Sequence, residues 1–85
     1  MDRETIRQEL IRILVTQDPG KKEAAEAATD ETDLITGLGL NSIGMLYLVI
    51  SIETSFMMRF DDVGMNDLRT FGSVIDYVEN KLNGK

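Results

Sequence analysis

Apolar residues recur at helical spacing in three stretches of this chain, and no stretch alternates between apolar and polar residues for long. Residues 3–16 carry one apolar stripe, residues 42–58 carry two, and residues 71–82 carry another. Apolar positions three and four residues apart share one face of a helix, whereas a half-buried strand would alternate. The pattern therefore predicts an all-α fold: a small four-helix bundle with three main helices, one short helix and a long first loop.

The boundaries of these helices are marked by turn and capping residues. Pro19 and Gly20 are expected to end the first helix, and Thr70 to cap the last. Residues 21–39 read as a long loop anchored by Leu34, Ile35 and Leu38, with an Ala-rich middle (residues 23–28) that could form a helical turn or two. A short helix or turn is expected at residues 64–69. The expected core residues on the helices are Ile6, Leu10, Ile13, Leu14, Met45, Leu48, Val49, Ile52, Phe56, Leu68, Phe71, Val74, Ile75, Val78 and Leu82.

The length of 85 residues predicts one domain, residues 1–85. The chain has no cysteine and no histidine, which excludes disulfides, thiolate metal sites and histidine-based acid–base catalysis. The N-terminus is charged and amphipathic, and the longest apolar run, residues 45–50, is too short to span a membrane. We therefore expect a soluble, cytoplasmic and monomeric protein without membrane insertion.

The net charge of −6 is unevenly distributed. Residues 23–62 hold eight acidic residues and one basic residue, so the whole deficit lies in the segment that contains Ser42. Nucleic-acid binding requires the opposite sign, and no nucleic-acid partner is expected. An acidic segment of this kind either steers a basic protein partner or is a solvated loop that aids solubility.

The helix expected at residues 42–58 is apolar on two sides. One side is assigned to the core, and the other carries Ile43, Leu46, Ile50 and Met57, with Tyr47 beside them. The second face of a surface helix is normally polar. Either other helices of the bundle cover this face, or it is an exposed patch used for binding.

Ser42 begins that helix after a turn that contains Gly37 and Gly39. Free backbone N–H groups and the positive end of the dipole favour a phosphate at a helix N-terminus. A serine hydroxyl is a poor nucleophile without an activating base. Ser42 is therefore expected to carry a group rather than to catalyse a reaction; the alternative is a capping serine without chemistry.

The segment Gly39-Leu40-Asn41-Ser42-Ile43, with its flanks at residues 33–38, 52–62 and 70–78, resembles the carrier-protein family of acyl and peptidyl carriers. The resemblance covers nearly the whole chain and implies a four-helix carrier, which Met1 and the short C-terminus lead us to expect as free-standing. It implies 4′-phosphopantetheine, supplied by coenzyme A and attached to Ser42 by a phosphopantetheinyl transferase, with Asn41 and Gly39 flanking the site. An acyl- or aminoacyl-loading enzyme and a downstream synthase or transferase, in fatty-acid, lipid or natural-product biosynthesis, are the other implied partners. The expected partner contacts are Leu40, Ile43, Leu46, Tyr47, Ile50, Glu53 and Met57.

Two residues depart from the family pattern. Asn41 stands where the family most often has Asp, which predicts slower or more selective modification. The helix expected at residues 42–58 has Glu53 as its only acid, and Tyr47 stands where the family often has an acid. This composition indicates partner enzymes dedicated to this carrier. The alternative function is an unmodified helical interaction module. The acidic charge disfavours a DNA-binding helix-turn-helix. The spacing of the Asp residues does not fit an EF-hand, and the lack of a catalytic base disfavours an enzyme.

Overall fold

The computed structural model describes residues 2–61 and 64–84. Within them lie four α-helices and two 3-10 helices: α1 (Arg3–Gln17), η1 (Pro19–Lys21), α2 (Lys22–Ala27), α3 (Ser42–Phe56), η2 (Met65–Leu68) and α4 (Phe71–Leu82). The predicted all-α four-helix fold is confirmed. The short α-helix is α2, formed by the Ala-rich part of the first loop. The segment at residues 64–69, expected as a short helix or turn, forms the 3-10 helix η2.

Capping residues fix both ends of α1. The Asp2 carboxylate accepts a hydrogen bond of 2.8 Å from the Thr5 backbone N–H, which satisfies one of the unpaired donors of the first turn. Asp18 adopts an extended conformation at the other end, directly before Pro19, because a residue before proline avoids helical backbone angles. The helix therefore ends where the sequence predicts.

The third helix, α3, is two residues shorter than predicted. Its last residue is Phe56, and Met57 follows in a left-handed conformation with φ of 52°. The backbone N–H groups of Met57 and Met58 both donate to the Glu53 carbonyl, which closes the helix end. The expected continuation to residue 58 is thus wrong, because the left-handed residue turns the chain away from the helix axis.

The long first loop is tied to the start of α4. Backbone hydrogen bonds join Leu34 N–H to the Arg69 carbonyl and Phe71 N–H to the Thr32 carbonyl, each at 2.9 Å. Gly72 N–H donates to the Asp30 carbonyl, and a Cβ at Gly72 would come within 2.8 Å of that oxygen. A loop of this length needs such anchoring, and here the backbone supplies much of it.

The core lies where α1, α3 and α4 meet, and the first loop adds further side chains to it. Leu34 and Leu38 are buried as expected, but Ile35 is 44% exposed and does not anchor the loop. Ile35 points outward because the Asp33 side chain folds the chain into a tight turn that directs Leu34 and Leu38 inward. Val49, Phe56 and Leu82 pack against the core while only partly buried.

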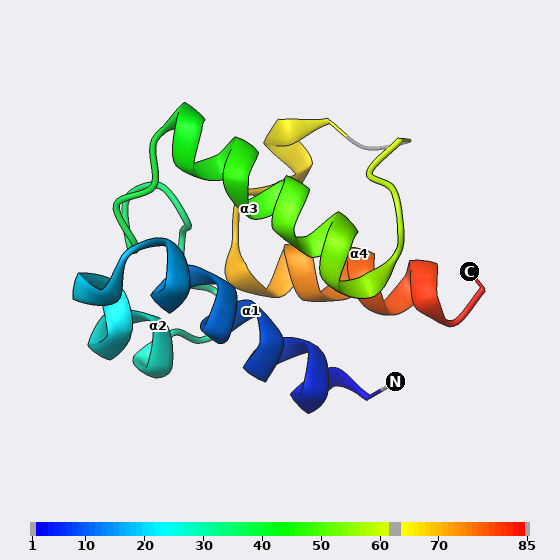
Figure 1. Cartoon of the computed structure of the whole chain (residues 1–85), viewed down its shortest axis with the longest axis horizontal. Helices are drawn as coiled ribbons and strands as arrows, with labels where there is room; N and C mark the ends of the chain where they lie inside the picture. The colour runs from blue at the N-terminus through cyan, green and yellow to red at the C-terminus, as the bar shows by residue number, and fades with distance from the viewer. Residues whose placement is uncertain (1, 62–63, 85) are drawn as a thin grey trace.

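Figure 1 shows α2 at one end of the molecule and both termini at the other. Arg3, at the start of α1, forms ion pairs with Asp76 and Glu79 of α4 and with Asp30 of the first loop. Gln17, at the other end of α1, donates to the Gly44 carbonyl of α3 at 3.1 Å. Each end of α1 is therefore held to a different neighbour.

Candidate functional site

Ser42 is the first residue of α3 and is exposed. The capping residue is its neighbour Asn41, whose side-chain oxygen accepts a hydrogen bond of 2.8 Å from Gly44 N–H. The reading of Ser42 itself as the cap is therefore wrong. Within the residues that the structure describes, the Ser42 hydroxyl makes no hydrogen bond, so it is available for attachment of a group.

The turn before Ser42 depends on a glycine and on a buried leucine. Gly39 has φ of 71°, a left-handed conformation that glycine adopts without strain. Leu40 then turns inward, is only 4% exposed, and donates its backbone N–H to the Leu34 carbonyl at 3.1 Å. The expectation that Leu40 contacts a partner is wrong, because its side chain belongs to the core and holds the turn in place.

Asp33 organises the loop that leads to this turn. Its Oδ1 accepts hydrogen bonds of 2.8 Å from Thr36 N–H and Ile35 N–H, and its Oδ2 lies 2.8 Å from Arg69 Nε. The Thr36 N–H first, then the Ile35 N–H and the Arg69 charge, hold the pKa of the Asp33 carboxyl below its ordinary value. The same carboxylate thus fixes the loop and links it to the segment before α4.

The N-terminus of α3 is suited to a phosphate. The first turn of a helix presents backbone N–H groups without helical partners, and only that of Gly44 is used by the Asn41 cap. A phosphate at Ser42 would also meet the positive end of the helix dipole. In the described part of the chain, no group of three or more acidic side chains is placed to hold a metal ion. The helix start therefore offers backbone N–H groups and a positive dipole end that a phosphate could meet.

Beyond Ser42, α3 presents an apolar surface to solvent. The exposed fractions are 66% for Ile43, 56% for Leu46, 58% for Tyr47, 48% for Ile50 and 91% for Met57. We call Ile43, Leu46, Tyr47 and Ile50 the α3 stripe, because they follow one another at helical spacing along one face. These exposures exclude the alternative that other helices of the bundle cover this second face of α3.

Glu53 differs from the other expected partner contacts. It is half-buried, and its carboxylate accepts a hydrogen bond of 2.8 Å from Phe60 N–H. Its role is to hold the chain that follows α3. The Glu53 carboxylate is therefore engaged within the chain, and its expected contact with a partner stays a prediction. Asp62, the last residue of the flank 52–62 that resembles the carrier family, lies outside the described residues.

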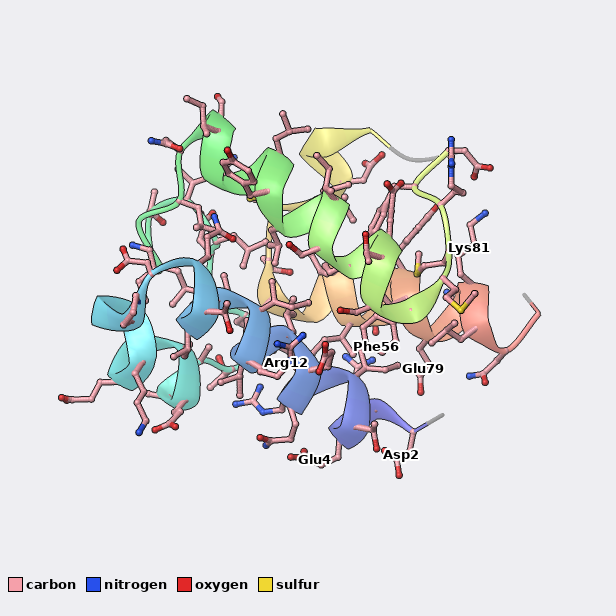
Figure 2. All side chains as sticks on the ribbon, in the orientation of Figure 1. Asp2, Glu4, Arg12, Phe56, Glu79 and Lys81 are labelled. Atoms are coloured by element: carbon pink, nitrogen blue, oxygen red, sulfur yellow. The ribbon has the colours of Figure 1, made fainter. Side chains whose placement is uncertain are left out.

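A groove runs between α1 and α3 beside the stripe, with a volume of about 400 Å³. Ile13 of α1, which is 4% exposed, lines it together with Tyr47 and Ile50 of α3. Figure 2 labels Arg12 on α1, which also lines the groove. The sequence did not indicate that α1 adds to this surface, because periodicity assigns each helix a face but not its neighbour.

No helix in the described residues combines the length and the apolar character that crossing a membrane requires.

No protein-family model matches the chain. A curated relative named acyl carrier protein, from Coprothermobacter proteolyticus, is 36% identical over 85 residues and covers both chains completely. Another acyl carrier protein, from Thermotoga maritima, is 29% identical over 72 residues, which span 85% of this chain and 86% of the relative. The chain therefore belongs to the acyl carrier protein family, and its role is that of a carrier rather than an enzyme.

Proposed function

We propose that Ser42 carries a 4′-phosphopantetheine arm, joined through a phosphodiester to its hydroxyl. The observation that carries the proposal is the exposed, unbonded Ser42 hydroxyl on the first residue of α3. Its own chain supplies no histidine or cysteine that could activate it. The arm must therefore be attached by a separate phosphopantetheinyl transferase that takes it from coenzyme A.

The residues around Ser42 fit this group. The backbone N–H groups at the start of α3 would meet its phosphate, and Gly39 keeps the preceding turn free of a side chain. When attached, the arm supplies a thiol that holds an acyl or aminoacyl group as a thioester. The protein then presents this cargo to a loading enzyme and to a downstream synthase or transferase. The contacts proposed for these partners are Ile43, Leu46, Tyr47, Ile50 and Met57.

Intact-protein mass spectrometry tests the proposal. The protein is incubated with coenzyme A, magnesium and a broad-specificity phosphopantetheinyl transferase, and one added phosphopantetheine is expected on the wild type. Ser42→Ala should gain none, whereas Ser55→Ala, which changes another exposed serine of α3, should be modified like the wild type. Absence of modification on the wild type would contradict the carrier proposal and favour an unmodified interaction module that uses the α3 stripe.

A further inference from the structure

Lys21 lies beside the turn that precedes Ser42. It is the last residue of η1, and its backbone N–H donates to the Asp18 carbonyl at 2.9 Å. A Cβ placed on Gly39 would lie 3.4 Å from Lys21 Nζ, so the ammonium group sits against the bare backbone of this glycine. The fold therefore brings a cation from η1 to the turn that carries Ser42.

The Lys21 ammonium is only loosely paired. The protein covers most of its stem, with 23% of the side chain exposed, which keeps the charged head near the turn. Its partner is Asp18, whose Oδ2 lies 3.5 Å from Nζ, farther than the roughly 2.7–2.9 Å of a charge-assisted hydrogen bond. The same carboxylate accepts a hydrogen bond from Gly20 N–H through its Oδ1. An ammonium has three N–H donors, and one distant carboxylate leaves donors for another anion.

A phosphate on Ser42 would add negative charge to an acidic part of the chain. Residues 23–62 hold eight acidic residues and one basic residue, Arg59. Arg59 follows the far end of α3, a helix of 15 residues that is about 22 Å long. Positive charge beside Ser42 is therefore supplied from outside this acidic segment, and Lys21 is the cation that contacts the turn.

The spacing between Lys21 and Ser42 is suited to an ion pair with a group attached to the serine. Gly39 and Ser42 are three residues apart, which places their Cα atoms within about 10 Å of each other. This separation is comparable to the Debye length of about 8 Å at physiological ionic strength. The four-carbon stem of lysine is flexible and ends in a point charge, so the ammonium can turn toward an anion without a change in the backbone.

We propose that Lys21 is a binding residue for the phosphodiester of the arm, toward which its ammonium turns from Asp18 once Ser42 is modified. The inference rests on the proposed function, because it concerns the group attached to Ser42. It assigns part of the site to η1. It also gives Gly39 a second role, since the lack of a side chain there is what lets the ammonium lie against the turn.

Energetic coupling between Lys21 and the phosphodiester gives the first test. The Tm of the unmodified and of the phosphopantetheine-bearing protein is measured for the wild type, Lys21→Gln and Lys22→Gln. Lys22, the exposed neighbour of Lys21, is the matched control. Attachment of the arm should be less stabilising in Lys21→Gln than in the wild type by about 2–4 °C in Tm, the size expected for a partly exposed ion pair. Lys22→Gln should respond to attachment as the wild type does.

This comparison separates binding of the arm from a purely structural role of Lys21. A lysine that only supports η1 would shift the Tm of both forms equally, so the change on attachment would be the same in all three proteins. In about 500 mM sodium chloride the difference between wild type and Lys21→Gln should fall below about 1 °C, because salt screens exposed charges. A difference that persists at that salt concentration would assign it to packing and overturn the proposal.

Amine labelling gives a second readout. Unmodified and phosphopantetheine-bearing wild-type proteins are treated with a trace of acetic anhydride, and fragmentation of the peptides by mass spectrometry reports the labelling of each lysine. Lys21 should be labelled about twofold more slowly after attachment, because an ammonium engaged by an anion is less available for acylation. Lys22 should be labelled equally in both forms. Equal labelling of Lys21 in both forms, with equal changes in Tm on attachment, would overturn the inference alone. A wild type that gains no phosphopantetheine would overturn the proposed function, and the inference with it.

Discussion

At the scale of single residues, the exposure of Ser42 is determined by its neighbours. Asn41 takes the capping position, so the serine hydroxyl is not used to satisfy the backbone of the first turn. Gly39 adopts a left-handed conformation and Leu40 turns into the core, which leaves Ser42 at the outer end of a fixed turn. A serine is common at helix starts, and it is this arrangement of three preceding residues that makes the hydroxyl accessible.

Asn41→Asp should speed the attachment of phosphopantetheine to Ser42. An Asp carboxylate can accept the same hydrogen bond from Gly44 N–H, and it adds a negative charge that a metal ion or a basic transferase surface would meet. The charge should also stabilise the helix start by about 0.3–1 kcal/mol. Transfer rates and thermal unfolding measure the two effects. The same amide-to-carboxylate change at Asn83, beyond the end of α4, should leave the transfer rate unaltered. Equal transfer rates for Asn41→Asp and the wild type would refute the charge argument.

Asp33 makes the loop before Ser42 sensitive to acid. Its pKa is held below the ordinary 3.8 by the N–H groups of Thr36 and Ile35 and by Arg69. A lowered pKa in the folded state means that the carboxylate stabilises the fold fully above pH 3.8, and that this stabilisation is lost as pH falls below that value. We expect amide hydrogen exchange at Ile35 and Thr36 to accelerate, relative to their intrinsic rates, over that acid range. In Asp33→Asn both amides should exchange faster at neutral pH without this additional acid-dependent step; an unchanged exchange rate would contradict the assignment.

At the scale of elements, helical periodicity was sufficient to place α1, α3 and α4 within one or two residues. The Ala-rich stretch also indicated where α2 forms. Periodicity failed where the backbone conformation of one residue decides the outcome. Met57 ends α3 in a left-handed conformation that non-glycine residues rarely adopt, and the Asp33 turn directs Ile35 outward although its neighbours are buried.

The candidate site was predicted in its centre and less well at its edges. Ser42, Asn41 and the exposed α3 stripe follow from the motif and from the second apolar face of the helix. Leu40 was expected to contact a partner because its residue type does not reveal that the turn directs its side chain into the core. In the same way, the residue type of Glu53 does not reveal that its carboxylate accepts a hydrogen bond from a backbone N–H. The groove with α1 requires knowing how two helices pack, and no pattern within one helix contains that information.

Met57→Gly should stabilise the fold. Glycine accepts the left-handed conformation that costs other residues about 1–2 kcal/mol, and the Met57 side chain is 91% exposed, so its removal takes little from the core. We expect the unfolding free energy to rise by about 1 kcal/mol, which is about 4–8 °C in Tm for a domain of this size. Met58→Ala is the contrasting variant, since Met58 is only 9% exposed and its truncation should lower Tm. A lower Tm for Met57→Gly would mean that the side chain packs in a way its exposure does not indicate.

At the scale of the whole molecule, the exposed apolar surface and the largest cluster of ion pairs lie on different elements. The α3 stripe contains no charged side chain, whereas carboxylates gather where the first loop and α4 approach the start of α1. Arg3 lies among Asp30, Asp76 and Glu79, and these ion pairs raise the pKa of its guanidinium, with Asp30 the largest contributor. One cation thus joins three segments that are distant in the sequence.

Arg3→Met should lower stability and reverse its response to salt. The substitution keeps an apolar stem but leaves Asp30, Asp76 and Glu79 facing one another without the cation. Because Arg3 is partly exposed, we expect a loss of about 1 kcal/mol. Added sodium chloride should then raise the Tm of Arg3→Met by screening the carboxylates, while it lowers or leaves unchanged that of the wild type. Arg12→Met, which removes a single exposed pair with Glu9 on one helix, should change Tm little at any salt concentration. Equal Tm values for Arg3→Met and Arg12→Met would mean that the Arg3 pairs add no more than an isolated surface ion pair.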